Sequence, residues 1–285
     1  MSSPEMLPHP LMLFHGLMSS PQEFGLMAHA LRSKGVRHEA PSVPGYTYAS
    51  AAPRPDWQAW RARAGELVAE RAGASADGRV ILGGLCMGGI LAAAAALEAP
   101  EKVAGLVLLS PSFVFDGWGL SPVRHLRHIG YWTGLDRFFS MRERPPYGVK
   151  NEKIRRWIAN ELAQRAQSAA GPARVPLPAL RQAERMLADV RARLHTLDCP
   201  ILVVHAREDE ISSLAGVERL FAALPQADKQ LVVLENSYHM ITIDNDRSQL
   251  CGLLDGFVRR VASASAPALP ARPAAASLRR VAGAR

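Results

Sequence analysis

The sequence predicts an α/β fold, with a mostly parallel sheet of about six strands and helices on both faces of that sheet. Short runs rich in Val, Ile and Leu alternate with longer helical patterns, as expected for parallel strands joined by crossover helices. Most of these runs are apolar throughout, which is typical of strands covered on both faces. One long stretch, residues 116–195, lacks this alternation and predicts a helical insertion into the same domain.

The core elements can be placed along the chain from their periodicity. The predicted strands are Leu11–Phe14, Val36–Ala40, Val80–Gly83, Val103–Leu109, Ile201–His205 and Gln230–Leu234. The predicted helices are Gln22–Ser33, Trp57–Arg71, Cys86–Glu98, Leu214–Ala223 and Asp246–Val261. Ser20, Pro21 and Glu23 predict a capping box with a proline at the first helical position. Asp56 is predicted to cap the next helix in the same manner.

The insertion divides the predicted core into residues 1–115 and 196–261. Amphipathic segments at Asn151–Gln167 and Leu180–Leu194 predict helices within it. Because the insertion follows the fourth strand, we expect it to cover the carboxyl ends of the strands, where open α/β sheets bind ligands. Residues 262–285 are rich in Ala and Pro and carry four arginines but no acidic residue, so a disordered basic tail is predicted.

Charge and cysteine content exclude several classes of protein. The net charge is +8, but arginines of the insertion are interleaved with Glu and Ala, which favours a solvated helix face over a nucleic-acid interface. No apolar run approaches about 18 residues, so no membrane span is predicted. Three cysteines without a secretory signal argue against disulfides and for a cytoplasmic location. No His or Cys cluster has metal-ligand spacing, and Cys199 and Cys251 are expected to be buried hydrophobic residues.

Cys86 lies in the sequence Gly84-Leu85-Cys86-Met87-Gly88, between a predicted buried strand and an Ala-rich helix. This context is that of a nucleophile elbow, in which glycines two positions before and after relieve the crowding of a strained turn. The start of a helix favours an anion, and the thiolate is the reactive form of cysteine. A small core cysteine or a nucleotide-binding turn could share the pattern. However, no Walker Lys-Ser/Thr follows, and a dinucleotide fingerprint would follow the first strand.

A base and an orienting acid follow the elbow in the required order of nucleophile, acid and histidine. Asp209 is in the loop after the strand Ile201–His205, and His239 is in the loop before the last helix. His239 is predicted to take the proton of the thiol and Asp209 to fix the tautomer of the imidazole. The neighbours Glu208 and Glu210 are expected to face solvent. Asp244 is interpreted as the N-cap of the last helix.

An acyl-transfer site also needs donors for an oxyanion. His15, Gly16 and Leu17 follow the first strand, in the position of a lipase-type oxyanion loop. The backbone N–H groups of Leu17 and Met87 are the predicted donor pair. His15 itself is expected to brace the loop rather than to catalyse.

These motifs occur in one order along most of the chain. They are LFHGL at 13–17, SPQEF at 20–24, the elbow at 84–88, HAREDE at 205–210 and SYHMITID at 237–244. Over residues 10–260 the sequence resembles bacterial carboxylesterases and monoacylglycerol-lipase-like enzymes of the α/β-hydrolase superfamily, the serine aminopeptidase S33-type group. The resemblance implies an α/β-hydrolase fold with a small helical cap, and hydrolysis of short or medium acyl esters without cofactor or metal. The departure is the nucleophile, since most of the group has Ser where this chain has Cys86.

Cysteine at the elbow occurs in other branches of the superfamily, among them dienelactone hydrolases and polyhydroxyalkanoate synthases. A thioester acyl-enzyme can pass its acyl group to an alcohol or amine as well as to water. The expected function is therefore carboxylesterase-like hydrolysis through an S-acyl-cysteine. The alternatives are a thioesterase or acyltransferase acting on a chain bound to CoA or to an acyl carrier, and a non-catalytic binding module on a hydrolase fold. Aromatic residues of the insertion and its edge are expected to form the acyl pocket, although they could equally pack inside the insertion: Phe113, Phe115, Trp118, Tyr131, Trp132 and Trp157.

Overall fold

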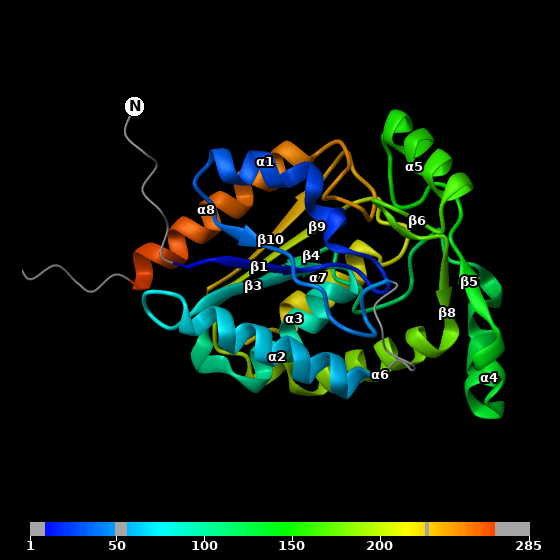
Figure 1. Ribbon diagram of the computed structural model, residues 1–285, viewed down its shortest axis with the longest axis horizontal. Coiled ribbons are helices and arrows are strands. Elements are labelled where there is room, and N and C mark those ends of the chain that lie inside the picture. Colours follow the sequence, from blue (N-terminus) through cyan, green and yellow to red (C-terminus); the bar gives the residue numbers. More distant parts are fainter. Residues whose placement is uncertain (1–8, 49–55, 226–227, 266–285) are drawn as a thin grey trace, which may run out of the picture.

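The computed structural model describes residues 9–48, 56–225 and 228–265 (Figure 1). Of the predicted tail, residues 262–265 continue the last helix, and the rest lies outside the described residues. Among the described residues, no helix combines the length and apolar character needed to cross a membrane.

The predicted parallel sheet of six strands is confirmed. Its order is β10-β9-β4-β3-β1-β2, and every neighbouring pair is parallel. The strands are β1 (Leu11–Phe14), β2 (His38–Glu39), β3 (Val80–Leu85), β4 (Val103–Leu109), β9 (Ile201–Ala206) and β10 (Lys229–Leu234). Phe14 of β1 pairs in register with Gly84 of β3. The loop after β1 therefore lies beside the turn that carries Cys86.

Helices cover both faces of the sheet (Figure 1). On one face, α1 (Gly25–Ser33) packs against α8 (Arg247–Ser265), and their apolar residues form one core cluster with β1, β3 and β4. On the other face lie α2 (Trp57–Gly73), α3 (Met87–Glu98), α6 (Leu177–Arg193) and α7 (Leu214–Ala223). Residues from these four helices form a second core cluster against the same sheet.

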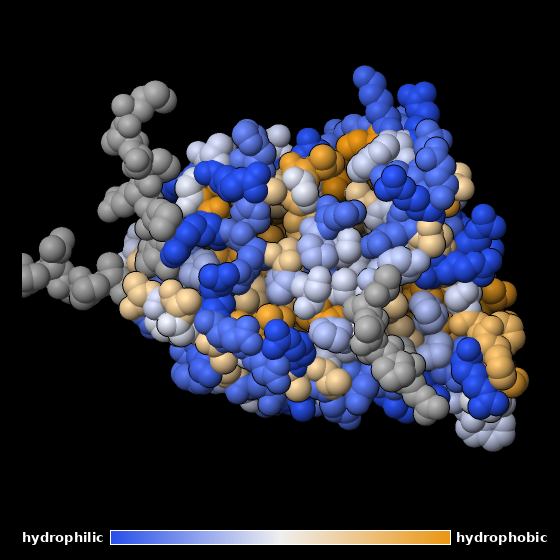
Figure 2. All heavy atoms as spheres, in the orientation of Figure 1, coloured by the Kyte–Doolittle hydropathy of each residue, from blue (hydrophilic) through white to orange (hydrophobic). Residues whose placement is uncertain are grey.

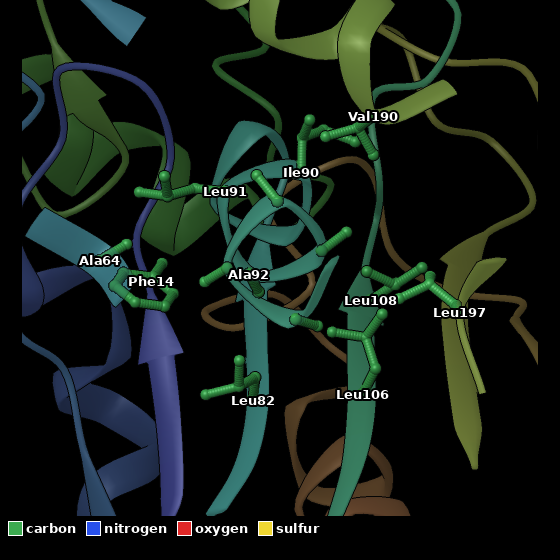
Figure 3. Packing of buried hydrophobic residues seen from close by; sticks show 14 of the residues in the cluster. Phe14, Ala64, Leu82, Ile90, Leu91, Ala92, Leu106, Leu108, Val190 and Leu197 are labelled. Atoms are coloured by element: carbon green, nitrogen blue, oxygen red, sulfur yellow. The ribbon is translucent and has the colours of Figure 1, made fainter. Parts of the chain in front are cut away.

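Helix α3 begins directly after the elbow and is buried on all sides. Its residues from Met87 to Ala96 are all buried, as expected of a helix that is apolar around its whole circumference. Figure 3 shows Ile90, Leu91 and Ala92 of this helix packed among side chains of the sheet, α2 and α6. The alanines allow α3 to approach β3 and β4 closely. This packing holds the first turn of α3, and thus the elbow, in a fixed place.

The insertion is not purely helical, contrary to the expectation from sequence. It contains the helices α4 (Arg127–Thr133) and α5 (Glu152–Gln164), and α6 leads from it back to the core. Short 3-10 helices η3 (Pro122–Leu126) and η4 (Leu135–Phe138) flank α4. Two small antiparallel sheets pair β5 (Ser140–Arg142) with β8 (Arg174–Pro176) and β6 (Gln167–Ser168) with β7 (Gly171–Pro172). Strands this short leave too little pattern in the sequence to be recognised. Figure 1 places these elements beyond one end of the central sheet.

Three predicted helix caps can be compared with the structure. Asp56 does cap α2, since its carboxylate accepts from the N–H of Gln58 at 3.0 Å. The predicted capping box at Ser20 is wrong: the first turn is the 3-10 helix η1 (Pro21–Phe24), and the hydroxyl of Ser20 caps nothing. The Glu23 side chain turns inward to Gly16 instead.

The prediction that Asp244 caps the last helix is also wrong. Helix α8 begins at Arg247, and the buried carboxylate of Asp244 accepts backbone N–H groups from Lys150, Asn151 and Tyr238. Asp244 therefore joins the start of α5 to the loop that carries His239.

Candidate active site

Cys86 occupies a strained turn between β3 and α3. Its backbone has φ 56° and ψ −122°, a conformation that L-residues rarely adopt and that costs of the order of 1–3 kcal/mol. A Cβ at Gly84 would overlap the backbone of Gly88 and the carbonyl of Phe14. A Cβ at Gly88 would likewise overlap that carbonyl. Both glycines of the motif are therefore required by close backbone packing, as the sequence analysis expected of an elbow.

His239 and Asp209 form a buried pair at the carboxyl ends of the strands. The Nδ1 atom of His239 lies 2.8 Å from Oδ2 of Asp209. The other carboxylate oxygen of Asp209 accepts the N–H groups of Ile211 and Ser212 at 2.8 and 2.9 Å. These contacts fix the carboxylate, which in turn fixes the orientation of the imidazole. The structure thus brings together the two residues predicted as acid and base.

The pair also sets the charge of its members. Burial alone would raise the pKa of Asp209, but the contact with His239, the nearby His205 and the N–H donors lower it. Burial would lower the pKa of His239, yet Asp209 and Cys86 raise it well above its ordinary value. Asp209 is therefore an anion at neutral pH, and His239 holds a proton strongly. His205 is itself buried, donates to the carbonyl of Ser212 at 2.9 Å and has a lowered pKa because of burial.

Cys86 and His239 line the same pocket, but the hydrogen bond of the Cys86 thiol is made with Ser112. Its Sγ lies 3.2 Å from Oγ of Ser112, a fully buried residue in the loop after β4. Within the described residues, Nε2 of His239 has no hydrogen-bond partner of good geometry. Cys86 is nevertheless close enough to His239 to raise the pKa of its imidazole.

The loop after β1 is braced by His15, as expected. The ring nitrogens of His15 bond to the carbonyl of Gly16 and to Oγ1 of Thr47, both at 2.8 Å. The Tyr46 hydroxyl donates to the carbonyl of His15 at 2.9 Å, and the two rings stack. Burial lowers the pKa of His15 to about 4, so the imidazole is neutral at pH 7. His15 is thereby a structural residue of the loop.

The predicted oxyanion donors, Leu17 and Met87, both line the pocket beside Cys86. Met87 is the first residue of α3, so its N–H is one of the donors that a helix cannot satisfy internally. Leu17 N–H donates to no backbone or side-chain acceptor in the described part of the chain. The arrangement leaves both groups free to bind an oxyanion, and their role stays a proposal.

Sequence reasoning missed two buried carboxyl groups beside this site. Glu210, expected to face solvent, is buried, and its carboxylate accepts the N–H of His239 at 3.1 Å. Glu208, in contrast, is exposed and pairs with Lys150. Glu23 is buried and accepts the N–H of Gly16 at 2.7 Å. Burial raises the pKa of Glu23 to about 7, with partial compensation by the Gly16 N–H and His239.

A pocket opens over Cys86 between the core and the insertion. Glu23, His239 and the predicted oxyanion residues form its floor. Its walls come from the loops and the insertion, and include Phe115, Leu120, Met141, Val175, Leu180 and Met240. Of the six aromatics proposed for it, Phe115 lines the pocket and the other five do not.

Those five aromatic side chains have other surroundings. Phe113 is fully buried in the core, and Trp118 packs edge-on against Tyr238. Tyr131 contacts Arg181, whereas Trp132 and Trp157 are exposed. Aromatic type alone does not tell which face of the insertion a side chain occupies, so the prediction for these five is wrong.

The remaining cysteines behave as expected of buried hydrophobic residues. Both Cys199 and Cys251 are buried and unpaired. Burial raises the pKa of Cys199 to about 12 and also raises that of Cys251. Their thiols are thus protonated at neutral pH. Among the described residues, no group of three or more His, Cys, Asp or Glu side chains could hold a metal ion.

A family described as serine aminopeptidase, S33 matches residues 9–246. The chain belongs to this family. A stretch of 77 residues of this chain is 30% identical to the thermostable monoacylglycerol lipase of Bacillus sp. (strain H-257). That alignment covers 27% of this chain and only 31% of the lipase. The family name refers to serine, whereas the elbow here holds Cys86.

Two further relatives align over more of the chain. The pimeloyl-[acyl-carrier protein] methyl ester esterase of Nitrosomonas europaea is 27% identical over 188 residues, which are 61% of this chain and 68% of the esterase. The crystal structure of the monoacylglycerol lipase of Paleococcus ferrophilus superposes with a TM-score of 0.71 at 17% identity. It covers 91% of this chain and 97% of the lipase. This likeness confirms the α/β-hydrolase fold.

Proposed function

We propose that the protein is a cofactor-free acyl hydrolase that works through an S-acyl intermediate on Cys86. The observation that carries the proposal is the buried His239–Asp209 pair, because its imidazole lines the same pocket as Cys86. An imidazole held in one tautomer by a carboxylate, beside a thiol at a helix start, is the arrangement that activates a sulfur nucleophile. Acyl chemistry is supported by Leu17 and Met87, which line the pocket beside the thiol and whose N–H groups would receive an oxyanion.

In the first half-reaction, His239 takes the proton of the Cys86 thiol and the sulfur attacks the acyl carbon. The bond to the leaving oxygen breaks, and His239 returns its proton to that oxygen. The Leu17 and Met87 N–H groups hold the negative charge on the former carbonyl oxygen. In the second half-reaction, His239 takes a proton from water as the water attacks the thioester carbon. The carbon–sulfur bond then breaks, and His239 returns the proton to the sulfur, which releases a free acid and regenerates the Cys86 thiol. The raised pKa of His239 favours the thiolate–imidazolium form from which the first attack begins.

The pocket favours an acyl group that is mainly apolar. Side chains such as Leu120, Met141 and Leu180 line its wall, and no lysine lies among its lining residues. The names of the relatives agree with this class, since they act on esters of acyl chains. The esterase relative is named for a methyl ester on a carrier-bound chain, so a chain bound to an acyl carrier is a second candidate substrate, with the carrier thioester as the bond that Cys86 would cleave. Both candidates share the S-acyl-Cys86 intermediate and differ in the leaving group.

Turnover of p-nitrophenyl esters and of acyl-CoA thioesters by the wild type, Cys86→Ala and Cys86→Ser tests the proposal. We expect Cys86→Ala to abolish turnover of both, and Cys86→Ser to retain part of the ester activity. Intact mass after a brief reaction should show one added acyl group on the wild type and none on Cys86→Ala. Unchanged turnover in Cys86→Ala would refute the assignment, and faster turnover of thioesters than esters would select the second candidate.

A further inference from the structure

The outer face of the insertion carries a stripe of exposed apolar side chains, which we name the apolar stripe. Its members recur every third residue through η3, α4, η4 and β5, and within the 3-10 helices η3 and η4 this spacing aligns side chains. Their exposed fractions range from 38% for Met141 to 87% for Trp132. The apolar stripe consists of Val123, Leu126, Ile129, Trp132, Leu135, Phe138 and Met141.

This degree of exposure distinguishes the stripe from ordinary surface residues. Single exposed apolar side chains need no explanation, whereas a contiguous set indicates a binding surface. Elsewhere, the large apolar side chains that are exposed in the described residues are Leu26, Trp118, Phe139 and Trp157, and Phe139 adjoins the stripe. Figure 2 shows hydrophobic spheres at the right-hand edge of the molecule, where Figure 1 places α4 and β5. Helix α4 itself has no buried residue, and its apolar side chains Ile129 and Trp132 are left uncovered by the described residues.

Arginines without acidic partners surround the stripe. Arg137, Arg142 and Arg144 are exposed, and none forms an ion pair within the described residues. The guanidinium of Arg137 lies over the ring of Phe138, at 4.8 Å from its centroid. The acidic residue of η4, Asp136, is buried beside Arg181 and adds no charge to this surface. Glu143, between Arg142 and Arg144, is also exposed and lines the pocket, so the border of the stripe is positive in sum but not in every residue.

The stripe is continuous with the mouth of the active-site pocket. Met141 belongs to the stripe and also lines the pocket. Leu120, Arg124 and Arg127, from the start of the same segment, line the pocket as well. The stripe and the pocket therefore share a border at Met141, so a molecule held at the stripe lies beside the pocket that contains Cys86.

We propose that the apolar stripe docks the protein on an anionic phospholipid bilayer, with the pocket mouth facing the lipid. Large apolar side chains that protrude from a short helix, bordered by arginines, are suited to the interface between headgroups and acyl chains. Tryptophan and phenylalanine supply buried area, and the long arginine side chains reach outward to phosphate groups. A second copy of the chain would bring its own arginines close to these, because the exposed arginines at the border outnumber the exposed Glu143.

Sedimentation with vesicles tests the docking independently of catalysis. Vesicles of phosphatidylglycerol and phosphatidylcholine in equal parts are compared with vesicles of phosphatidylcholine alone. We expect the wild type to bind the anionic vesicles more tightly and to be released at high salt, since screening weakens the contribution of the arginines. The double variant Trp132→Ser/Phe138→Ser should bind them at least about tenfold more weakly. Binding by Arg137→Glu/Arg142→Glu should fall on anionic vesicles and change little on neutral ones.

Leu26→Ser is the control, because Leu26 is also a large exposed apolar residue but lies on α1, far along the chain from the insertion. It should bind vesicles as the wild type does, and all variants should keep the melting temperature of the wild type. Absence of vesicle binding by the wild type would overturn the proposal, as would equal binding by Trp132→Ser/Phe138→Ser. A wild-type dimer that Trp132→Ser converts to a monomer, without vesicle binding, would assign the stripe to a second copy. None of these outcomes depends on whether Cys86 is the nucleophile.

Discussion

Removing the Ser112 hydroxyl should slow the reaction of Cys86 without altering the pocket. Ser112 is fully buried, and its Oγ makes the hydrogen bond to Sγ, at 3.2 Å. A hydrogen bond to a charged group contributes about 1.5–3 kcal/mol, and one between neutral groups about 1 kcal/mol. The Ser112 hydroxyl stabilises the thiolate, so Ser112→Ala should lower the rate of Cys86 alkylation about 10-fold, the change that corresponds to about 1.4 kcal/mol.

The assay is alkylation by iodoacetamide at fixed pH, followed by the mass of the peptide that contains Cys86. Ser112→Thr keeps the hydroxyl and should restore most of the rate. Ser110→Ala is the matched control, because Ser110 is equally buried, lies two residues away and has a hydroxyl with no hydrogen-bond partner in the described structure. An alkylation rate in Ser112→Ala equal to that of Ser110→Ala would refute the reasoning. A faster rate in Ser112→Ala would show instead that Ser112 holds the sulfur away from its base.

Three further predictions concern the base, the elbow and a buried carboxyl. Asp209→Asn should lower kcat about 10³- to 10⁴-fold with little change in KM, because the imidazole loses its tautomer and its charge partner; steady-state kinetics check this. Gly88→Ala should destabilise the fold by about 3 kcal/mol or more, because its Cβ would overlap the carbonyl of Phe14. In contrast, Gly252→Ala in helix α8, where a Cβ meets nothing, should stabilise by about 0.5–1 kcal/mol, and urea unfolding separates the two. Glu23 has a pKa of about 7 against an ordinary 4.5, so its favourable contribution is complete below about pH 4.5 and is lost as pH rises to about 7. Wild-type stability relative to Glu23→Gln should therefore fall by up to about 3 kcal/mol between about pH 5 and about pH 8, and a constant difference would contradict the raised pKa.

The sequence predicts the core of this protein well because its strands and helices are set by local patterns. The run Ile201–Ala206 is apolar in nearly every position and is bounded by Pro200, which leaves few alternatives to a buried strand. The catalytic residues could also be predicted, since the elbow glycines, Asp209 and His239 follow the ends of such strands in a fixed order. For these elements, local pattern and tertiary structure agree.

Prediction failed where the direction of a polar side chain depends on contacts distant in sequence. Glu210 and Glu208 are neighbours of the same type in one loop, yet one turns to the N–H of His239 and the other to Lys150. Glu23 fits a capping box but accepts from Gly16, which the turn after β1 places beside it. The aromatic side chains of the insertion present the same difficulty. The sequence of a helix that is exposed on one side does not show which of its apolar side chains face the pocket and which face outward.

The hydrogen bonds of Asp244 limit which part of the insertion can move during turnover and which part can be exchanged by mutagenesis. One carboxylate ties the backbone at Lys150 and Asn151 to the backbone at Tyr238, immediately before the base. The N–H of Met240 adds a bond to the carbonyl of Gly148 at 2.8 Å. The insertion is thus anchored to the histidine loop at one end, so any motion that admits substrate must hinge elsewhere in it. Exchange of the whole insertion for that of a relative would displace the base unless residues 148–151 were kept.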